Sequence, residues 1–163
     1  MKIGVISDTH DNIKNIEKSV KIFRQKGVNF VIHAGDYVSP KSVKAFQGIK
    51  LVGILGNNDK DISGLSNAFN YISGELKGEF CEMEQDGTRF AVYHGTKSQC
   101  KNSLIQSGNY DVVICGHTHK LENLNVGITT VLNPGTANGW FFGYNATFAI
   151  YNTETRQSEF INL

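Results

Sequence analysis

Residues 2–12, KIGVISDTHDN, combine a short apolar run with an abrupt polar ending. The apolar residues 3–6 predict a strand that is buried on both faces. Asp8 and His10 follow this strand two positions apart, so in an extended chain their side chains would point the same way. Open α/β sheets bind their ligands at the carboxyl ends of the strands. Asp8 and His10 are therefore the first candidate metal ligands.

Length and composition exclude some classes of function. The chain has 163 residues, of which 40% are hydrophobic and 19% are charged, as in an ordinary globular domain. We predict one domain, residues 1–163. The formal net charge of +1 argues against nucleic-acid or anionic-membrane binding through bulk charge. No apolar run approaches the roughly 20 residues of a membrane-spanning helix.

The cysteines indicate a reducing environment. Cys81, Cys100 and Cys115 are odd in number and form no CxxC pair, so neither a disulfide framework nor a zinc ribbon is indicated. The N-terminus shows no basic segment followed by a long apolar one, so we expect no secretory signal. The prediction is a cytoplasmic protein with free thiols.

The first sixty residues alternate strands and helices. The predicted elements are strands at 3–6, 30–32 and 51–55, a helix at 13–23 and a short helix after Pro40. Right-handed connections between such strands build a parallel sheet. Asp36 and Asn57 follow the second and third strands, so the sheet brings them to the same edge as Asp8 and His10.

The remaining sequence is richer in strands. It predicts a helix or lid at 62–71, a helix at 98–106, and strands near 80–83 and at 89–93, 112–115, 121–126, 129–132, 147–151 and 159–161. The dipeptide Asp86-Gly87 is typical of a hairpin turn. We expect this half to be mainly antiparallel, and the two halves to form two sheets packed face to face, each covered by helices.

Seven polar residues stand just beyond predicted strands. They are Asp8, His10, Asp36, Asn57, His94, His117 and His119. Four of the five histidines of the chain belong to this set. Carboxylate, imidazole and amide ligands suit borderline divalent ions, and seven ligands are too many for one tetrahedral site. Two ions sharing a carboxylate would use them all, and such a pair can clamp a phosphoryl group and activate water.

These motifs resemble a known family. Asp8-x-His10, Gly35-Asp36, Gly56-Asn57, His94 and Gly116-His117-Thr118-His119 are similar, in order and spacing, to the calcineurin-like metallophosphoesterases. The sequences SDTH at 7–10 and NPGT at 133–136 are similar to the YfcE-like phosphodiesterase branch, and the chain looks close to an archaeal member of it.

The resemblance implies a four-layer α/β/β/α sandwich with a dinuclear metal centre. One metal would be held by Asp8, His10 and His119. The other would be held by Asn57, His94 and His117, and Asp36 would bridge the two. A water or hydroxide activated between the metals would attack phosphorus in line with the leaving oxygen.

Asn58 departs from the pattern of the family. Many relatives have at this position a histidine that is assigned as the general acid, and an amide cannot donate a proton as an acid. We expect Asn58 to hydrogen-bond a phosphate oxygen as the remaining catalytic group. A missing general acid matters least for leaving groups that are stable as anions, so activated aryl esters would be favoured, unless a water acts as the acid.

Each candidate residue also has a structural explanation. Asp8, His10 and Asp36 could belong to turns that cap helices. Asn57 could be a turn residue, and the three later histidines could be structural. We expect His33 to pack or to orient a ligand.

Two further segments keep two interpretations each. Residues 133–136 could form a simple turn or lie on the substrate side of the site. The aromatic residues 140–144 could cover the core, or form an exposed patch for a substrate base or for a subunit contact in a homo-oligomer.

The function predicted from the sequence is a metal-dependent phosphodiesterase that acts on a small phosphate ester. We expect Mn²⁺ in the site, with Ni²⁺, Fe²⁺, Co²⁺ and Zn²⁺ as alternatives. The alternative function is a protein-binding scaffold of the retromer-subunit type with a vestigial metal site. The presence of the complete set of candidate histidines favours the enzyme.

Overall fold

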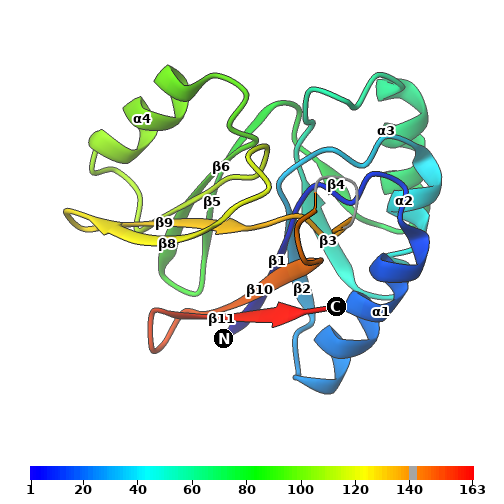
Figure 1. Ribbon diagram of the computed structural model, residues 1–163, viewed down its shortest axis with the longest axis horizontal. Coiled ribbons are helices and arrows are strands. Elements are labelled where there is room, and N and C mark those ends of the chain that lie inside the picture. The colour runs from blue at the N-terminus through cyan, green and yellow to red at the C-terminus, as the bar shows by residue number, and fades with distance from the viewer. Residues whose placement is uncertain (140–142) are drawn as a thin grey trace.

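The structure is a computed structural model that describes residues 1–139 and 143–163 (Figure 1). In chain order, its elements are β1 (Lys2–Ile6), α1 (Ile13–Gln25), β2 (Phe30–His33), α2 (Pro40–Lys44), β3 (Lys50–Gly53), α3 (Ile62–Tyr71), β4 (Glu75–Leu76), β5 (Phe80–Gln85), β6 (Thr88–Tyr93), α4 (Ser98–Gln106), β7 (Val112–Ile114), β8 (Leu121–Val126), β9 (Thr129–Pro134), β10 (Thr147–Asn152) and β11 (Gln157–Asn162).

Two sheets lie face to face between helices (Figure 1). One sheet has the strand order β11-β10-β1-β2-β3-β4, and the other has the order β5-β6-β7-β9-β8. Helices α1, α2 and α3 cover the outer face of the first sheet, and α4 covers that of the second (Figure 1). The predicted α/β fold with an α/β/β/α layering is confirmed.

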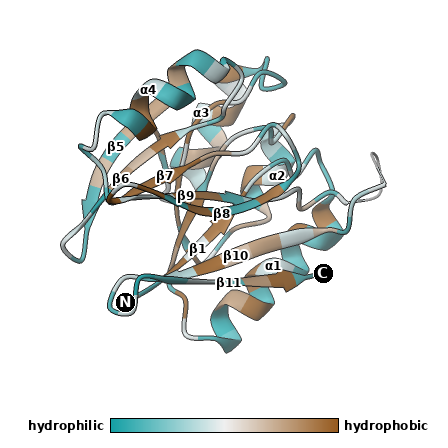
Figure 2. Ribbon diagram, turned by 60° about the vertical axis from the view of Figure 1, so that its left-hand side comes forward, coloured by the Kyte–Doolittle hydropathy of each residue, from teal (hydrophilic) through white to brown (hydrophobic). Residues whose placement is uncertain are grey.

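Alternation along β1 explains how the layers hold together. Ile3 and Val5 face the second sheet and share a core with Ile114 of β7. Ile6 belongs to the other core, beneath the helices, together with Phe23 of α1. Burying one such side chain contributes about 1.5–3 kcal/mol. The hydropathy colouring in Figure 2 shows the resulting pattern, with hydrophobic strands inside and helices that are hydrophobic on one side only.

Helix α1 follows the predicted pattern closely. Asn12 caps its start, because the Asn12 side chain accepts a hydrogen bond from the Asn15 N–H at 3.2 Å. Its buried stripe includes Val20 and Phe23. Gly27 follows the helix with φ +74°, a conformation that glycine adopts without steric cost.

The second half of the chain differs from the prediction in part of its strand pairing. Strands β6, β7 and β9 pair in parallel, and only β5 and β8 are antiparallel to their neighbours in this sheet. Strands β10 and β11 join the first sheet, where β10 runs antiparallel to β1. Four pairs formed by strands of this half are antiparallel (β5–β6, β8–β9, β10–β11 and β1–β10) and two are parallel (β6–β7 and β7–β9), so the half is mainly antiparallel as expected. The parallel centre of the second sheet and the membership of β10 and β11 in the first sheet were not predicted, because a local pattern predicts a strand but not its partner.

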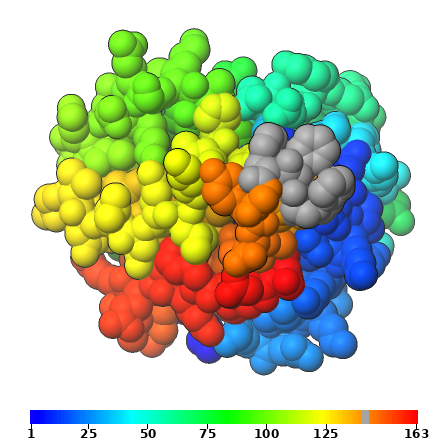
Figure 3. Space-filling model, in the orientation of Figure 1, coloured from blue at the N-terminus to red at the C-terminus, as the bar shows by residue number. Residues whose placement is uncertain are grey.

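The pairing of β1 with β10 brings the two ends of the chain together. Lys2 lies opposite Asn152 in this pair. Figure 3 shows the same proximity on one face, where blue and red segments touch. The short strand β4 was missed by the sequence analysis, since two residues carry no periodicity. None of the described helices is both long and apolar enough to cross a membrane.

Candidate metal centre

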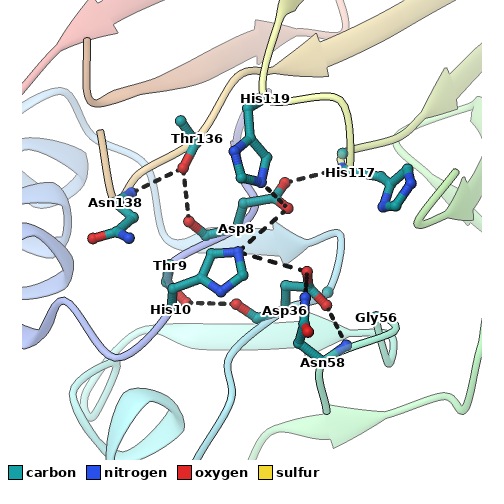
Figure 4. A network of polar contacts seen from close by, with 12 residues as sticks. Asp8, Thr9, His10, Asp36, Gly56, Asn58, His117, His119, Thr136 and Asn138 are labelled. Atoms are coloured by element: carbon teal, nitrogen blue, oxygen red, sulfur yellow. Dashed lines mark hydrogen bonds and ion pairs between the residues drawn. The ribbon is translucent and has the colours of Figure 1, made fainter. Parts of the chain in front are cut away.

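The seven predicted ligands all lie in loops that follow strands. Asp8 and His10 follow β1, Asp36 follows β2, Asn57 follows β3, His94 follows β6, and His117 and His119 follow β7. Because both sheets point these strand ends toward one edge, residues from the whole chain meet there (Figure 4).

The backbone of these loops is unusual. Asp8, His10, Asp36, His117 and His119 all have φ between +40° and +65°. This left-handed region is uncommon for residues other than glycine, and such residues cluster at functional sites. Asp8 and His10 therefore converge through a turn and not through strand alternation. The prediction that these two side chains lie together is correct, but the extended conformation from which it followed is not the one they adopt.

Asp8, His10 and His119 form a compact group. The His119 Nε2 atom lies 3.1 Å from Asp8 Oδ1, and the His10 Nε2 atom lies 3.8 Å from the same oxygen. One ligand atom from each of the three residues lies within 4.8 Å of the others. Figure 4 shows the two rings converging on this carboxylate. These are the residues that the resemblance assigns to one metal.

Asp36 connects this group to His94. The Asp36 Oδ2 atom lies 3.4 Å from His94 Nε2 and 3.6 Å from His10 Nε2. Ligand atoms of Asp8, Asp36 and His94 form a second group within 4.8 Å. The Nδ1–H group of His94 donates a hydrogen bond to the carbonyl oxygen of Ala34, with a distance of 2.7 Å between nitrogen and oxygen. The Nε2 atom of the ring therefore keeps the lone pair that a metal needs.

Asn57 and His117 lie at the wall of the site. Both line a cavity of about 300 Å³ together with His10, Asp36 and His119. Among the described residues, His117 joins neither of the two compact ligand groups. In Figure 4 its ring points away from the Asp8 carboxylate. Its ring centroid lies 5.3 Å from that of His94.

The carboxylates and imidazoles shift one another's ionisation in the metal-free protein. Burial opposes ionisation of Asp8, but the contacts with His10 and His119 outweigh it and hold the pKa of Asp8 well below its usual value. The contact with Asp8 raises the pKa of His10. Burial lowers the pKa of His117, helped by the neighbouring His94. The site therefore keeps negative carboxylates among imidazoles at neutral pH.

Several buried atoms of the site lack a hydrogen-bond partner in the described part of the chain. They are Asp8 Oδ1, His10 Nε2 and His94 Nε2. Leaving a buried polar atom unpaired costs about 1–3 kcal/mol. Two divalent cations, one beside Asp8 and His10 and the other beside His94, would satisfy all three atoms, and oxygen and imidazole donors suit such cations. The residues present therefore fit the metals that the family implies.

Asn58 contacts the carboxylate of Asp36. Its side-chain Nδ2 donates to Asp36 Oδ2 at 2.7 Å, and its backbone N–H donates to Asp36 Oδ1 at 2.9 Å. Asn58 also lines the cavity with the predicted ligands. It thus holds Asp36 in place from the side on which a substrate would enter.

Asp59 is an anchor whose role the sequence did not predict in detail. Its carboxylate accepts hydrogen bonds from the backbone N–H groups of Asp36 at 2.8 Å, Val38 at 2.8 Å and Gly56 at 2.7 Å. Asp59 is 5% exposed. One buried side chain therefore fixes two ligand-bearing loops to each other. Acidic residues also cap helices, so the sequence alone did not distinguish these roles.

His33 and Thr9 link the β1 and β2 loops. His33 Nδ1 accepts a hydrogen bond from Gly35 N–H at 3.1 Å, so His33 Nε2 donates to Thr9 Oγ1, also at 3.1 Å. The ring stacks on Tyr37 with centroids 3.9 Å apart. Burial lowers the pKa of His33 to about 3. His33 is thus a neutral residue that packs and orients the loops.

The segment 133–136 donates hydrogen bonds to the loops that follow β7 and β1. Asn133 is fully buried, and its amide donates to the Gly116 carbonyl oxygen at 2.9 Å and to Thr118 Oγ1 at 3.1 Å. Thr136 Oγ1 donates to the Asp8 carbonyl oxygen at 3.0 Å (Figure 4). The segment positions the loops that carry the ligands.

Two glycines allow the backbone of neighbouring loops to lie close to the carboxylates of Asp36 and Asp8. A Cβ atom at Gly56 would lie 2.2 Å from Asp36 Oδ1, and one at Gly116 would lie 2.6 Å from Asp8 Oδ2. Any side chain at either position would displace a predicted ligand, which explains why glycine precedes Asn57 and His117.

The predicted aromatic patch falls largely outside the described residues, since 140–142 are not among them. Tyr144, its last member, is 39% exposed and lines the cavity of the site. Its ring centroid lies 6.4 Å from that of His119.

Comparison with known proteins agrees with this geometry. Residues 1–156 match the calcineurin-like phosphoesterase superfamily domain. A phosphodiesterase of Methanocaldococcus jannaschii is 38% identical over 160 residues, which are 96% of this chain and 96% of that protein.

Solved structures show the same fold. That of an archaeal phosphodiesterase is similar over 100% of both chains, with a TM-score of 0.94 at 36% identity. The YfcE phosphoesterase of E. coli has a TM-score of 0.73 at 16% identity over 99% of both chains. Vps29 of Chaetomium thermophilum has a TM-score of 0.73 at 14% identity, over 99% of this chain and 95% of that one. At the two lower identities the likeness concerns the fold alone. This chain therefore belongs to the calcineurin-like phosphoesterase superfamily and is an enzyme of that class.

Proposed function

We propose that this enzyme is a metal-dependent phosphodiesterase with a dinuclear centre that acts on small phosphate esters. The observation that carries the proposal is the pair of ligand groups, Asp8-His10-His119 and Asp8-Asp36-His94. Asp36 Oδ2 lies 3.6 Å from His10 Nε2 and 3.4 Å from His94 Nε2, so it can reach both groups, and in the described part of the chain Asp8 Oδ1, His10 Nε2 and His94 Nε2 have no hydrogen-bond partner. The preference for diesters follows from the phosphodiesterases to which the chain is similar.

The ligands are proposed as the resemblance assigns them. Asp8, His10 and His119 would hold one cation, Asn57, His94 and His117 the other, and Asp36 would bridge. Two divalent cations, proposed as Mn²⁺, would lower the pKa of a water and neutralise the charge of the phosphate.

The side chain of Asn58 orients the proposed bridging ligand Asp36. Asn58 holds Asp36 through two hydrogen bonds, and from its place in the cavity it would also donate to a phosphate oxygen. Since an amide supplies no proton to the leaving group, the enzyme would favour esters whose leaving group is a stable anion.

Hydrolysis of bis-p-nitrophenyl phosphate tests the function. Turnover should disappear with EDTA and return with Mn²⁺ or Ni²⁺, and Asp36→Asn should abolish it. Asp111→Asn serves as the matched control, because Asp111 contacts only Arg89 and backbone outside the site. A purified protein that binds no metal and shows no metal-stimulated turnover would instead indicate the scaffold alternative.

Asn58→His tests the proposed cost of the missing acid. A histidine at this position should accelerate esters with poor leaving groups by up to about 10²-fold, and p-nitrophenyl esters much less. A series of aryl esters with rising leaving-group pKa gives the comparison. An equal effect on all members of the series would refute this explanation.

The cytoplasmic location, the single domain over residues 1–163 and any self-association remain predictions. The three free cysteines suit a reducing compartment.

A further inference from the structure

A second cleft opens beside the candidate metal centre. It has a volume of about 540 Å³, within the range of small-molecule sites. Asn57 lines both this cleft and the cavity of the metal centre, and the buried His94 lines the cleft as well. A phosphate ester held at the metal centre would therefore have room to extend one of its two arms into the cleft.

The walls of the cleft suit a ring. Leu55, Ile62 and Tyr93 provide apolar surface. The Tyr93 hydroxyl oxygen accepts a hydrogen bond from the Lys97 backbone N–H at 3.0 Å, which fixes the tyrosine ring against the loop before α4. The phenolic proton of Tyr93 remains available as a donor. An aromatic ring or a sugar on the ester arm would fit such a surface.

Two lysines from different loops also line the cleft. Lys60 lies between β3 and α3, and Lys97 lies just before α4. Both are exposed, and among the described residues neither ammonium group makes an ion pair. Glu79 also lines the cleft and opposes them, while the Asp59 carboxylate is occupied by three backbone N–H groups. The exposed charges therefore favour an anionic occupant.

We propose that this cleft binds a further phosphate group carried on one ester arm of the substrate, with Lys60 and Lys97 as its partners. The inference rests on the proposed phosphodiesterase function and narrows the substrate class. The preferred diester would be a nucleotide-like ester that bears a second phosphate beyond a sugar or ring.

Two esters that differ only in that phosphate test the proposal. The first is the p-nitrophenyl ester of thymidine 5′-phosphate, and the second is the same ester with an added 3′-phosphate. Both release p-nitrophenol, so the chemistry at the metal centre is the same. The added phosphate should raise kcat/KM about tenfold, mainly through a lower KM, and the ratio should fall as ionic strength rises.

Variants that change the charge of the cleft test whether positive charge raises the ratio of the two kcat/KM values and negative charge lowers it. The double variant Lys60→Gln/Lys97→Gln should bring the ratio of the two kcat/KM values close to one. Glu79→Gln should increase the ratio. Lys18→Gln is the matched control, because Lys18 is an exposed lysine on α1, outside the cleft, and this variant should leave the ratio unchanged.

The results of these measurements distinguish a failure of the proposal for the cleft from a failure of the proposed phosphodiesterase function. Turnover of both esters with a ratio near one in the natural protein would overturn the proposal and leave the phosphodiesterase function standing. A high ratio that survives the double lysine variant would place the phosphate elsewhere and also overturn it. Metal-loaded protein that hydrolyses neither ester would refute the proposed function, and the inference would fall with it.

Discussion

The two halves of the candidate metal centre differ in how many of their histidines lie in a compact ligand group. Asp8, His10 and His119 form one group in which the ligand atoms face one another. Of the other half, His94 lies in a compact group with Asp8 and Asp36, whereas His117, among the described residues, stands outside both groups at the wall of the cavity. A preformed group loses less freedom on binding, so we expect the Asp8 half to bind its cation more tightly.

Asp36 and His117 variants should separate the halves most clearly. Asp36 would bridge the two cations and lies close to both His10 and His94, so Asp36→Asn should remove both metals and lower turnover by about 10³-fold or more. His117→Ala should reduce the bound metal from two ions to one. Metal analysis of the purified variants and bis-p-nitrophenyl phosphate hydrolysis give the comparison. Loss of both ions in His117→Ala would show that the halves fill only together.

Asp59→Asn should weaken both halves without removing a ligand. An amide in place of the carboxylate has one acceptor oxygen fewer, so at least one N–H group of Asp36, Val38 or Gly56 loses its partner. Loss of such supporting contacts typically lowers metal affinity by 10–100-fold.

Calorimetric titration with Mn²⁺ measures this affinity, and thermal unfolding of the metal-free protein measures the accompanying loss of stability. In Asp111→Asn, which loses an ion pair with Arg89 outside the site and keeps an acceptor oxygen for the Arg89 N–H, the affinity should not change. Equal affinities in the two variants would assign Asp59 to general stability alone.

His33 should make the metal-free protein sensitive to mild acid. Its pKa is lowered to about 3 in the folded protein, whereas an unfolded histidine titrates near 6.5. The unfolded state therefore binds more protons between these values, and stability falls as the pH drops below about 6.5. The slope is about 1.4 kcal/mol per pH unit for one proton.

Urea unfolding in EDTA between pH 4.5 and 6.5 measures that slope. Near pH 6.5 unfolded histidines are half protonated, so the raised pKa values of His10 and His94 give a slope of the opposite sign there. Below about pH 5.5 both residues are protonated in both states and add no slope, so the slope of His33 is measured in that range. His33→Gln should flatten the dependence, while His117 contributes in the same direction as His33 and remains in the variant. An unchanged slope in His33→Gln would mean that another group binds the proton.

The candidate ligands could be predicted because their signal is local. An apolar run that ends in Asp8, Asp36 or His94 is visible in a few neighbouring residues. The anchors that hold them were harder to identify. Asp59 contacts Asp36 and Val38 across two loops, and Asn133 holds the Gly116 carbonyl oxygen from another strand. Neither contact leaves a pattern in the surrounding sequence.

Residue order and type alone therefore specified the strands longer than two residues, the helix α1 and the set of polar residues at the strand ends, because periodicity acts over a single turn or strand. Folding in three dimensions set the rest: the pairing of β10 with β1, the parallel strands of the second sheet, and the left-handed backbone at Asp8 and Asp36. These features depend on contacts between segments far apart in the chain, which hold strained loops that no local preference would select.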